Sequence, residues 1–327
     1  MRRMSRSGIG STAGFGLGAF SRDELDTVHY ATLQIFQDTG IKVMNEEALE
    51  IFHGGGCGVE RFKGYGIVKI PSYVVEECAF WAPHSIVYDA CDPDKDYLAE
   101  PTRVGFTTFG GCINVVDPHT RKIRGATKKD CGEIARVCDY LDEICVVTRS
   151  VNSTDVPAGA LSVHNLDALL RNTGKHIFLG VDSPRSLEVM IELASVATGG
   201  RDNFIKRPNF TPSICPISPL TLPNNSCNVI INSARSGLGV LVLPMALSGG
   251  TSSATLAGTL VTHNTEVLSG IILAQLTKKG VPCTYGSTST ILDLRFGTSA
   301  IGSPEYGMIN ASIAVSYTHL TLPTIQL

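Results

Sequence analysis

The stretch KHIFLGVDSPRSLEVMIELASVATGGRDNFIKRPNFTPSIC, residues 175–215, decides the fold class. It opens with an apolar run at 175–180 and closes with a second one at 210–215. The segment between them starts with Ser183 and Pro184, a common helix start, and has the pattern of a helix. A helix between two short apolar runs is typical of a strand–helix–strand unit, in which the two strands lie parallel.

The same alternation repeats along most of the chain. Six short apolar runs are separated by helical segments, and the runs lie at 104–110, 143–148, 175–180, 210–215, 240–245 and 282–287. This repetition predicts a parallel sheet. Six units exceed what a dinucleotide-binding domain needs, and no Gly-rich fingerprint follows the first run. We therefore expect an α/β fold, a (β/α)8 TIM barrel truncated to about six βα units.

The chain before this repetition has a different pattern. SRDELDTVHYATLQIFQDTG, residues 21–40, begins with the capping-box residues Ser21 and Glu24 and predicts a first helix. Strand and helix signals follow it in mixed order up to about residue 100. We expect three parts, namely a flexible N-terminal tail at 1–20, an N-terminal α+β extension at 21–100 and the incomplete TIM barrel at 101–314.

Composition excludes several function classes. The 327 residues carry a net charge of -3 without a clustered basic stripe, which argues against a nucleic-acid partner. The apolar stretches are too short, or too interrupted by polar residues, to span a bilayer. Ten cysteines include no C-x-x-C pair, which favours reduced, mostly buried thiols over disulfides or structural zinc. We expect a cytoplasmic protein that binds a small molecule and no metal, nucleic acid or membrane.

In a barrel of this type the active site lies at the carboxyl ends of the strands. The residues that follow the six runs include no H-x-H pair, no lysine placed for a Schiff base and no paired glutamates for glycoside hydrolysis. They are mostly small residues with a few aromatics and aspartates, a lining that suits a small cationic ligand. No catalytic residue is assigned. The candidate substrate-binding residues are Phe109, Asp155, Ser218, Met245, Thr251, Tyr285, Ser287, Asp293 and Arg295.

Most of these candidates have a structural alternative. Two further polar residues, His263 and Glu266, lie inside a long helix predicted at about 253–279 and are expected to be satisfied core groups. For the candidate Asp155, and likewise for Asp182 after the third run, the alternative is helix capping or turn formation. For Asp293 and Arg295 the alternative is pairing with each other. For Phe109 and Tyr285 it is packing inside the barrel.

Several motifs resemble the corrinoid-dependent trimethylamine methyltransferase family. They are PISPLTL at 216–222, VLPMALSGGTSSATLAGTLVTHNTEVLSGIILAQLTKKGVPCTYGS at 242–287 and LRFGTSAIGSPEYG at 294–307. Earlier segments, GIKVMNEEAL at 40–49 and RNTGKHIFLG at 171–180, agree with it. The resemblance covers about residues 20–315, and its Thr-rich SGGTSSATLAG stretch followed by EVLSG is specific.

This resemblance implies a barrel that moves a methyl group from a methylated amine to the Co(I) of a separate corrinoid protein. The chain itself is then expected to bind no cofactor directly, and to form a homo-oligomer. One branch of the family acts on trimethylamine and uses pyrrolysine. A larger branch, the interpretation that we favour, acts on glycine betaine and related quaternary amines without pyrrolysine. A quaternary nitrogen leaves as a neutral amine, whereas trimethylamine needs prior activation.

The candidate residues fit that chemistry as hypotheses. Aromatic faces would desolvate a trimethylammonium group, and Asp293 or Asp155 would offset its charge. Arg295 would hold the carboxylate of a betaine. Two alternatives remain, a non-catalytic barrel that binds quaternary amines and a fragment that is inactive as written.

The last residues depart from the family pattern. Ser303, Pro304 and Glu305 begin a helix, which we expect to end before SYTHLTLPT because that segment is rich in β-branched residues and closes on Pro323. The decapeptide VSYTHLTLPT looks like the translation of a transposase-based sequencing adapter. We therefore expect residues 315–327 to be an artefact and the chain to be truncated there, ahead of the last barrel units and the family's pyrrolysine position.

Overall fold

The computed structural model describes residues 20–100, 103–320 and 324–326, so the predicted tail lies almost wholly outside the described residues. The described chain divides into two compact units. The first unit comprises Ile86–Ser213, and the second comprises the residues up to Ser85 together with Ile214–Gln326. This division differs from the predicted boundaries, because the predicted extension at 21–100 is shared between the two units.

The first unit is built on four parallel strands. The register pairs each strand with the next along the chain, so the order is β6 (Phe106–Thr107), β9 (Ile144–Thr148), β10 (His176–Gly180) and β11 (Phe210–Ile214). Each of these strands lies within one of the predicted apolar runs. The first strand is much shorter than its run at 104–110, and its pairing with β9 shifts register between Phe106 and Thr107.

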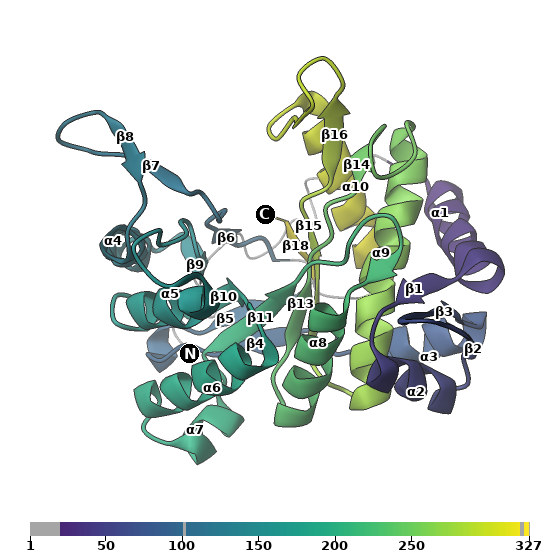
Figure 1. The fold of residues 1–327 in the computed structure, drawn as a ribbon, viewed down its shortest axis with the longest axis horizontal. Coiled ribbons are helices and arrows are strands. Elements are labelled where there is room, and N and C mark those ends of the chain that lie inside the picture. Colours follow the sequence, from purple (N-terminus) through teal and green to yellow (C-terminus); the bar gives the residue numbers. More distant parts are fainter. Residues whose placement is uncertain (1–19, 101–102, 321–323, 327) are drawn as a thin grey trace. The chain divides into compact units, whose positions relative to one another are not determined.

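Four helices belong to this unit, and the first two contact its strands directly, α4 at β9 and α5 at β10 (Figure 1). They are α4 (Lys128–Tyr140), α5 (Leu161–Leu170), α6 (Pro184–Ala197) and α7 (Arg201–Lys206). Thr127 and Asp130 form a capping box at the start of α4, and Ser183 caps α6 ahead of Pro184. Short 3-10 turns occur at Pro93–Lys95 and Ala158–Ala160.

Two antiparallel hairpins complete the first unit. One pairs β4 (Ile86–Tyr88) with β5 (Tyr97–Ala99), and the ring of Tyr88 packs edge-on against Phe178 of β10. This aromatic contact explains why the end of the predicted extension belongs here. The other pairs β7 (Asn114–Val116) with β8 (Ile123–Gly125) and projects away from the helices of its unit (Figure 1).

The second unit contains three parallel strands packed on helices. They are β13 (Val240–Val242), β15 (Cys283–Ser287) and β18 (Thr324–Gln326), with β15 in the middle. The helices α8 (Asn224–Ser236) and α9 (Leu256–Thr277) contact each other and β13. Most side chains of α9 are buried, from Leu260 to Gln275, so this helix forms the core of the unit.

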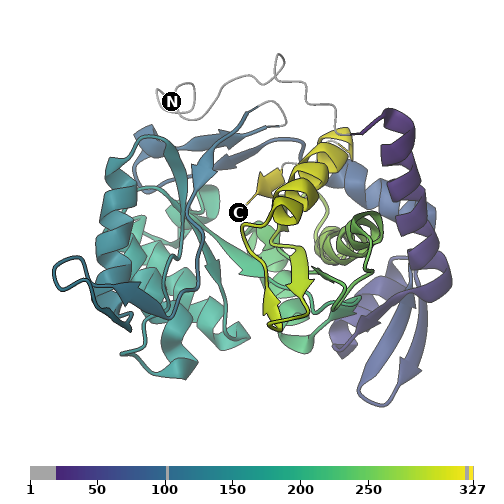
Figure 2. The same ribbon diagram turned by 90° about the horizontal axis from the view of Figure 1, so that it is seen from above.

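The N-terminal extension packs around α9. Its first helix α1 (Arg22–Gln34) has the predicted capping box and lies beside α9 (Figure 2), before a π-helical turn at Ile35–Thr39. The remaining elements are α2 (Glu46–Gly54), α3 (Ser72–Trp81) and a sheet of β1 (Ile41–Val43), β2 (Gly58–Phe62) and β3 (Tyr65–Lys69). The sheet gains a fourth, parallel strand, β12 (Thr221–Leu222), on the free edge of β1. The part of the extension up to Ser85 is therefore built into this unit.

A second small sheet joins β14 (Leu247–Ser248), β16 (Thr290–Asp293) and β17 (Thr298–Ser299), and α10 (Pro304–Leu320) follows it. The amide of Tyr306 donates to Ser303 Oγ, which confirms the predicted start of α10. The predicted end was wrong, because the helix continues to Leu320. Relative to alanine, each β-branched or aromatic residue costs a helix only about 0.5 kcal/mol. Such residues therefore do not end a helix by themselves.

Candidate functional site

The loop after β6 closes on the end of β9. Thr108 Oγ1 donates to the carbonyl of Thr148 at 2.7 Å and accepts from the amide of Thr148 at 3.0 Å. A Cβ at Gly110 would lie 1.6 Å from the carbonyl oxygen of Arg149, so only glycine fits there. The candidate Phe109 is 44% exposed beside this turn. The residue is therefore partly exposed at this strand end, and its contact with a ligand stays a prediction.

Arg149 is a residue of this region that the sequence analysis missed. It directly follows Thr148, the last residue of β9, and its two terminal nitrogens lie 3.9 Å and 4.0 Å from the positions that Cβ atoms would take at Gly111 and Gly180. A cation directly after an apolar run was the available signal. The guanidinium thus lies at the ends of neighbouring strands, next to residues without side chains.

The two aspartates that follow β9 and β10 accept hydrogen bonds from the first turns of helices. Asp155 Oδ1 accepts from the amide of Lys128 at 2.8 Å, at the start of α4. Asp182 Oδ2 accepts from the amide of Ser162 at 2.7 Å, at the start of α5. In both cases the helix served is the one that precedes the strand. The capping alternative is confirmed for both residues, and a substrate contact of Asp155 stays a prediction.

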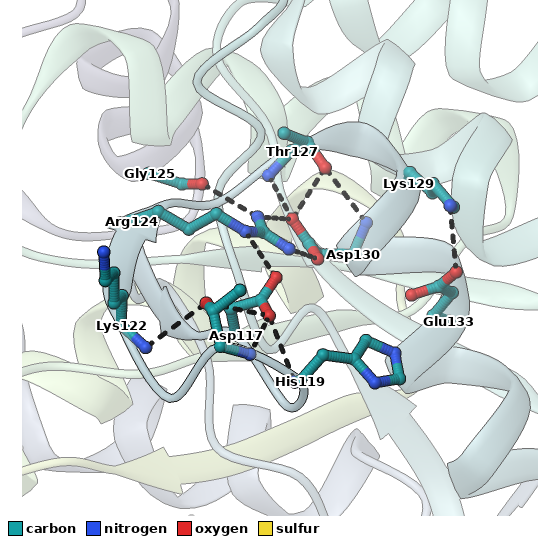
Figure 3. A network of polar contacts seen from close by, with 10 residues as sticks. Asp117, His119, Lys122, Arg124, Gly125, Thr127, Lys129, Asp130 and Glu133 are labelled. Carbon is teal, nitrogen blue, oxygen red and sulfur yellow. Dashed lines mark hydrogen bonds and ion pairs between the residues drawn. The ribbon is translucent and has the colours of Figure 1, made fainter.

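The β7–β8 hairpin is tied to α4 by a network of charges (Figure 3). Arg124 binds Asp130 with both terminal nitrogens, at 2.7 and 2.8 Å, and Asp117 through Nε at 3.2 Å. The backbone amide of Thr120 and then the guanidinium of Arg124 lower the pKa of Asp117 to about 2. Three apolar side chains of this hairpin and its base are more than half exposed, those of Ile113, Val116 and Ile123.

In the second unit, residues 216–221 form a tight turn after β11, which we call the strand-end loop. The amide of Ile217 donates to the carbonyl of Thr221 at 2.8 Å, and the reverse bond is 3.0 Å long. The candidate Ser218 points its hydroxyl at Glu266 of α9, with 2.7 Å between Ser218 Oγ and Glu266 Oε2. The amide of Leu220 donates to the other oxygen, Oε1, at 2.9 Å.

Glu266 is only 1% exposed, and burial raises its pKa to about 7 against the opposing effect of its two hydrogen bonds. The prediction that Glu266 is a satisfied core polar group is confirmed. The sequence analysis did not foresee that its partner would be one of the candidate site residues. Ser218 and Glu266 lie 48 positions apart, so no local pattern could join them.

Two further candidates, Met245 and Thr251, lie at or just before the Gly-rich turn that follows β13. Thr251 Oγ1 accepts from the amide of Leu247 at 3.0 Å and so closes the turn. Ser248 Oγ bonds the carbonyl of Ser253 at 3.1 Å. Met245 is half-buried ahead of this turn. The hydroxyl of Thr251 therefore has a structural role, and substrate contacts of Thr251 and Met245 stay predictions.

Tyr285 lies in the layer between β15 and α9. The side chain is 1% exposed, and its ring packs edge-on against His263 with 5.4 Å between the ring centres. Its hydroxyl bonds Asn264 Oδ1 at 3.5 Å. Ser287, at the end of the same strand, is also 1% exposed and accepts from the amide of Ser289 at 3.2 Å. Both candidates are buried, so the structure favours the packing alternative for Tyr285.

His263 is fully buried beside this layer. Ser289 Oγ accepts from the amide of Ala246 at 3.0 Å and lies within hydrogen-bond distance of His263 Nδ1, at 2.9 Å. Nε2 has no hydrogen-bond partner among the residues that the structure describes. Burial lowers the pKa of His263 to about 3, so the ring is neutral, and the expectation of a fully satisfied side chain holds for one nitrogen only.

Asp293 and Arg295 pair with each other. The amide of Arg295 donates to Asp293 Oδ1 at 2.9 Å, and the guanidinium reaches Oδ2 at 3.4 Å. The amide and then the side chain of Arg295 lower the pKa of Asp293. The Arg295 side chain is 83% exposed. The pairing alternative is confirmed, and a contact of either residue with a substrate stays a prediction.

A surface groove of roughly 330 Å³ lies between α4 and α5. Most of its charged groups pair within the groove, as in the contact of Lys128 Nζ with Asp167 at 2.6 Å. Across the described ranges, no three His, Cys, Asp or Glu side chains are grouped as metal ligands. Within the same ranges, no helix is both long and apolar enough to cross a membrane.

Comparison with solved structures shows a similar fold in the monomethylamine methyltransferase of Methanosarcina barkeri. The TM-score is 0.51 at 11% sequence identity, and the match covers 99% of this chain and 70% of the other. The likeness agrees with the predicted α/β architecture of parallel strands and helices. The six predicted strands are present, four in the first unit and two, β13 and β15, in the second.

Curated relatives are much closer in sequence. The chain is 43% identical to a trimethylamine methyltransferase of Desulfitobacterium hafniense over 99% of its length, and 39% identical to one of Methanosarcina barkeri over 97%. A glycine betaine methyltransferase of Desulfitobacterium hafniense is 28% identical over 89%. The chain spans 65% of the length of the first two relatives and 60% of the third.

The family model described as trimethylamine methyltransferase (MTTB) matches residues 15–325. The match includes both units and much of the segment that we expected to be foreign. The resemblance stated from the motifs is therefore confirmed over almost the whole sequence. This chain belongs to the trimethylamine methyltransferase (MTTB) family.

Proposed function

We propose that the protein of which this chain forms a part transfers a methyl group from a methylated amine to a corrinoid carried by a separate protein. The family match over residues 15–325 is the observation that carries this proposal. Because the chain spans only 65% of the first relatives, the activity of the whole protein remains a proposal. The corrinoid supplies the nucleophile that accepts the methyl group, and the chain supplies binding and orientation.

The methyl donor is the second part of the proposal. A pocket that desolvates an alkylammonium group needs apolar and aromatic surface, and Phe109, 44% exposed, lies at a strand end. Relatives named for trimethylamine are more similar to this chain than the relative named for glycine betaine. Trimethylamine is thus the first donor to test, with glycine betaine, the donor favoured from the sequence, as the second.

Closure of the sheet into a barrel, assembly into a homo-oligomer and a cytoplasmic location belong to the same proposal. All ten cysteines are free thiols, which supports a reducing compartment. Seven of them are buried in the packed interior, where a thiol behaves as a small apolar group. A closed barrel would bring the strand ends of the whole protein around one mouth.

The decisive experiment is a methyl-transfer assay on the full-length protein. The protein is mixed with its reduced corrinoid partner and either trimethylamine or glycine betaine, and the absorbance change of the methylated corrinoid is followed. We expect turnover with one donor and little with the other. Binding of an amine by calorimetry without any methylation would instead identify a non-catalytic binding barrel. The chain of 327 residues tested alongside shows whether this part is active alone.

A further inference from the structure

Glu266 is a buried acid in the middle of α9, and it binds one segment of the candidate site with both oxygens. The two contacts go to Ser218 and to the amide of Leu220, at 2.7 and 2.9 Å. We propose that Glu266 is a positioning residue, which fixes the conformation of the strand-end loop at 216–221 without touching the substrate.

The strand-end loop has a backbone that needs support. Leu220 has a φ of 51°, in the left-handed region that residues with a side chain seldom adopt. The amide and the carbonyl of Leu220 are bound by two different segments. The carbonyl of Leu220 accepts from the amide of Lys42 in β1 at 2.9 Å, and the amide of Leu220 donates to Glu266. Without Glu266 this half-buried amide would lose its acceptor, which is a costly arrangement.

The chemistry of the contact suits a carboxyl group in either protonation state. When it is ionised, Glu266 accepts from both Ser218 and Leu220. When it is protonated, Oε1 still accepts from the Leu220 amide while Oε2 donates to the Ser218 oxygen, because a hydroxyl can reverse its role. Glutamine can reproduce this second pattern with its own oxygen and amide nitrogen. Alanine can reproduce neither pattern.

The loop presents its own side chains to the surroundings. Ile217 is 55% exposed, and Cys215, just ahead of the loop, is exposed as well. The position of Ile217 therefore depends on the turn that Glu266 holds. That this loop contributes to methyl transfer rests on the proposed function, whereas the link between Glu266 and the loop does not.

Hydrogen exchange measured by mass spectrometry on the whole chain tests the inference without any assay of activity. In Glu266→Ala, the peptide that covers residues 216–222 should exchange about tenfold faster, because the Leu220 amide loses its acceptor. In Glu266→Gln, exchange of the same peptide should stay within about twofold of the parent.

Gln275 provides a matched control on the same helix. It is 1% exposed, and its side chain binds the turn after α9, donating to the carbonyl of Val281 at 2.7 Å and accepting from the amide of Gly280 at 2.8 Å. Gln275 also bonds Cys283 Sγ at 3.3 Å, so Gln275→Ala removes three side-chain hydrogen bonds where Glu266→Ala removes two, and it does so near the last turn of α9. We expect it to accelerate exchange around residues 280–283 and to leave the strand-end loop unchanged.

The inference is overturned if Gln275→Ala accelerates the loop as much as Glu266→Ala does, since the loop would then only report overall stability. It is also overturned if Glu266→Gln behaves like Glu266→Ala. Should Glu266→Ala fail to fold, Ser218→Ala gives a milder break of the same contact. Faster hydrogen exchange of the peptide at residues 216–222 in Ser218→Ala than in the parent supports the inference, and an unchanged rate contradicts it.

Discussion

Lys175 is a fully buried cation whose ammonium group serves the end of a helix. It is 0% exposed, and Nζ donates to the carbonyls of Cys138 and Leu141, the latter at 2.6 Å. Both carbonyls belong to the last turn of α4, where the helix dipole favours a positive charge. Lys175 directly precedes β10, at the opposite end of that strand from the candidate residues, so it is not placed for a Schiff base at the strand ends. The structure gives the residue this other role.

Lys175→Met should destabilise the protein while preserving the volume of the side chain. Two buried carbonyls lose their donor, so we expect a loss of about 1–3 kcal/mol in the free energy of unfolding, measured by urea titration. Lys129→Met is the control, because that side chain is 83% exposed and only approaches Glu133 at 3.6 Å. An equal effect of both substitutions would contradict the role assigned to Lys175.

Glu266 makes the stability depend on pH in a definite direction. Burial raises its pKa from 4.5 to about 7, so between these values the folded chain binds more protons than the unfolded chain does. Its contribution to stability therefore falls as the pH rises through this window. Glu266→Gln removes that fall, and its stability relative to the parent should improve by about 1–3 kcal/mol from pH 5 to pH 8. A stability difference that stays constant over this range would contradict the raised pKa.

At the scale of elements, periodicity predicted the regular strands and helices and missed the small irregular ones. The strands β9, β10 and β15 lie within one residue of their apolar runs. β13 ends at Val242, well before the predicted end of its run, which contains Pro244, a residue without an amide donor. The β7–β8 hairpin was missed because three-residue strands held by a charge network have no apolar alternation to detect.

The same limit applies to the candidate site. Residue type and position after a run identified Ser218, Asp155 and Asp293, but not what each of them would bind. The pairing of Asp293 with Arg295 is a short-range contact that had been foreseen as an alternative. Capping by Asp155 had been foreseen too, but the helix start that it binds lies 27 positions upstream. The contact between Ser218 and Glu266 depends on how α9 packs against the loop, and tertiary packing of this kind leaves no trace in a local pattern.

The close approach of the loop after β6 to the end of β9 can be tested by a single substitution. A Cβ at Gly110 would lie 1.6 Å from the carbonyl oxygen of Arg149, so Gly110→Ala must displace the backbone of one of the two segments. We expect a loss of about 1–3 kcal/mol in the free energy of unfolding, measured by urea titration. Gly159→Ala is the matched control, because nothing lies within 4 Å of its Cβ position. A loss of similar size in both variants would rule out the steric explanation.

At the scale of the whole molecule, the chain order does not follow the division into units. The second unit combines the first part of the chain with the last, and the pairing of Lys42 with Thr221 joins these distant segments. The predicted boundary at residue 100 treated the extension as a separate preface. Apolar periodicity marks elements and does not say which distant element they pack against, so it gave no sign of this pairing.

The ten cysteines provide a test of packing across both units. Cys112 and Cys215 are exposed, Cys91 is intermediate and the other seven are buried. Burial raises the pKa of Cys57, Cys78, Cys227 and Cys283 to about 12, which further suppresses their reactivity. Brief alkylation of the native protein, followed by peptide mass spectrometry, should therefore modify Cys112 and Cys215 first. Early modification of Cys283 would show that the core is packed differently.

The two capping aspartates have a consequence for protein engineering. Asp155 and Asp182 each follow a strand and yet hold the first turn of the helix before that strand. Parallel strand–helix folds are often redesigned by exchanging strand-end loops as if these were independent modules. Here a transplanted loop would remove the cap of a helix encoded upstream of the graft. A successful chimera would have to carry over the aspartate at the same loop position, or supply the upstream helix with a substitute acceptor.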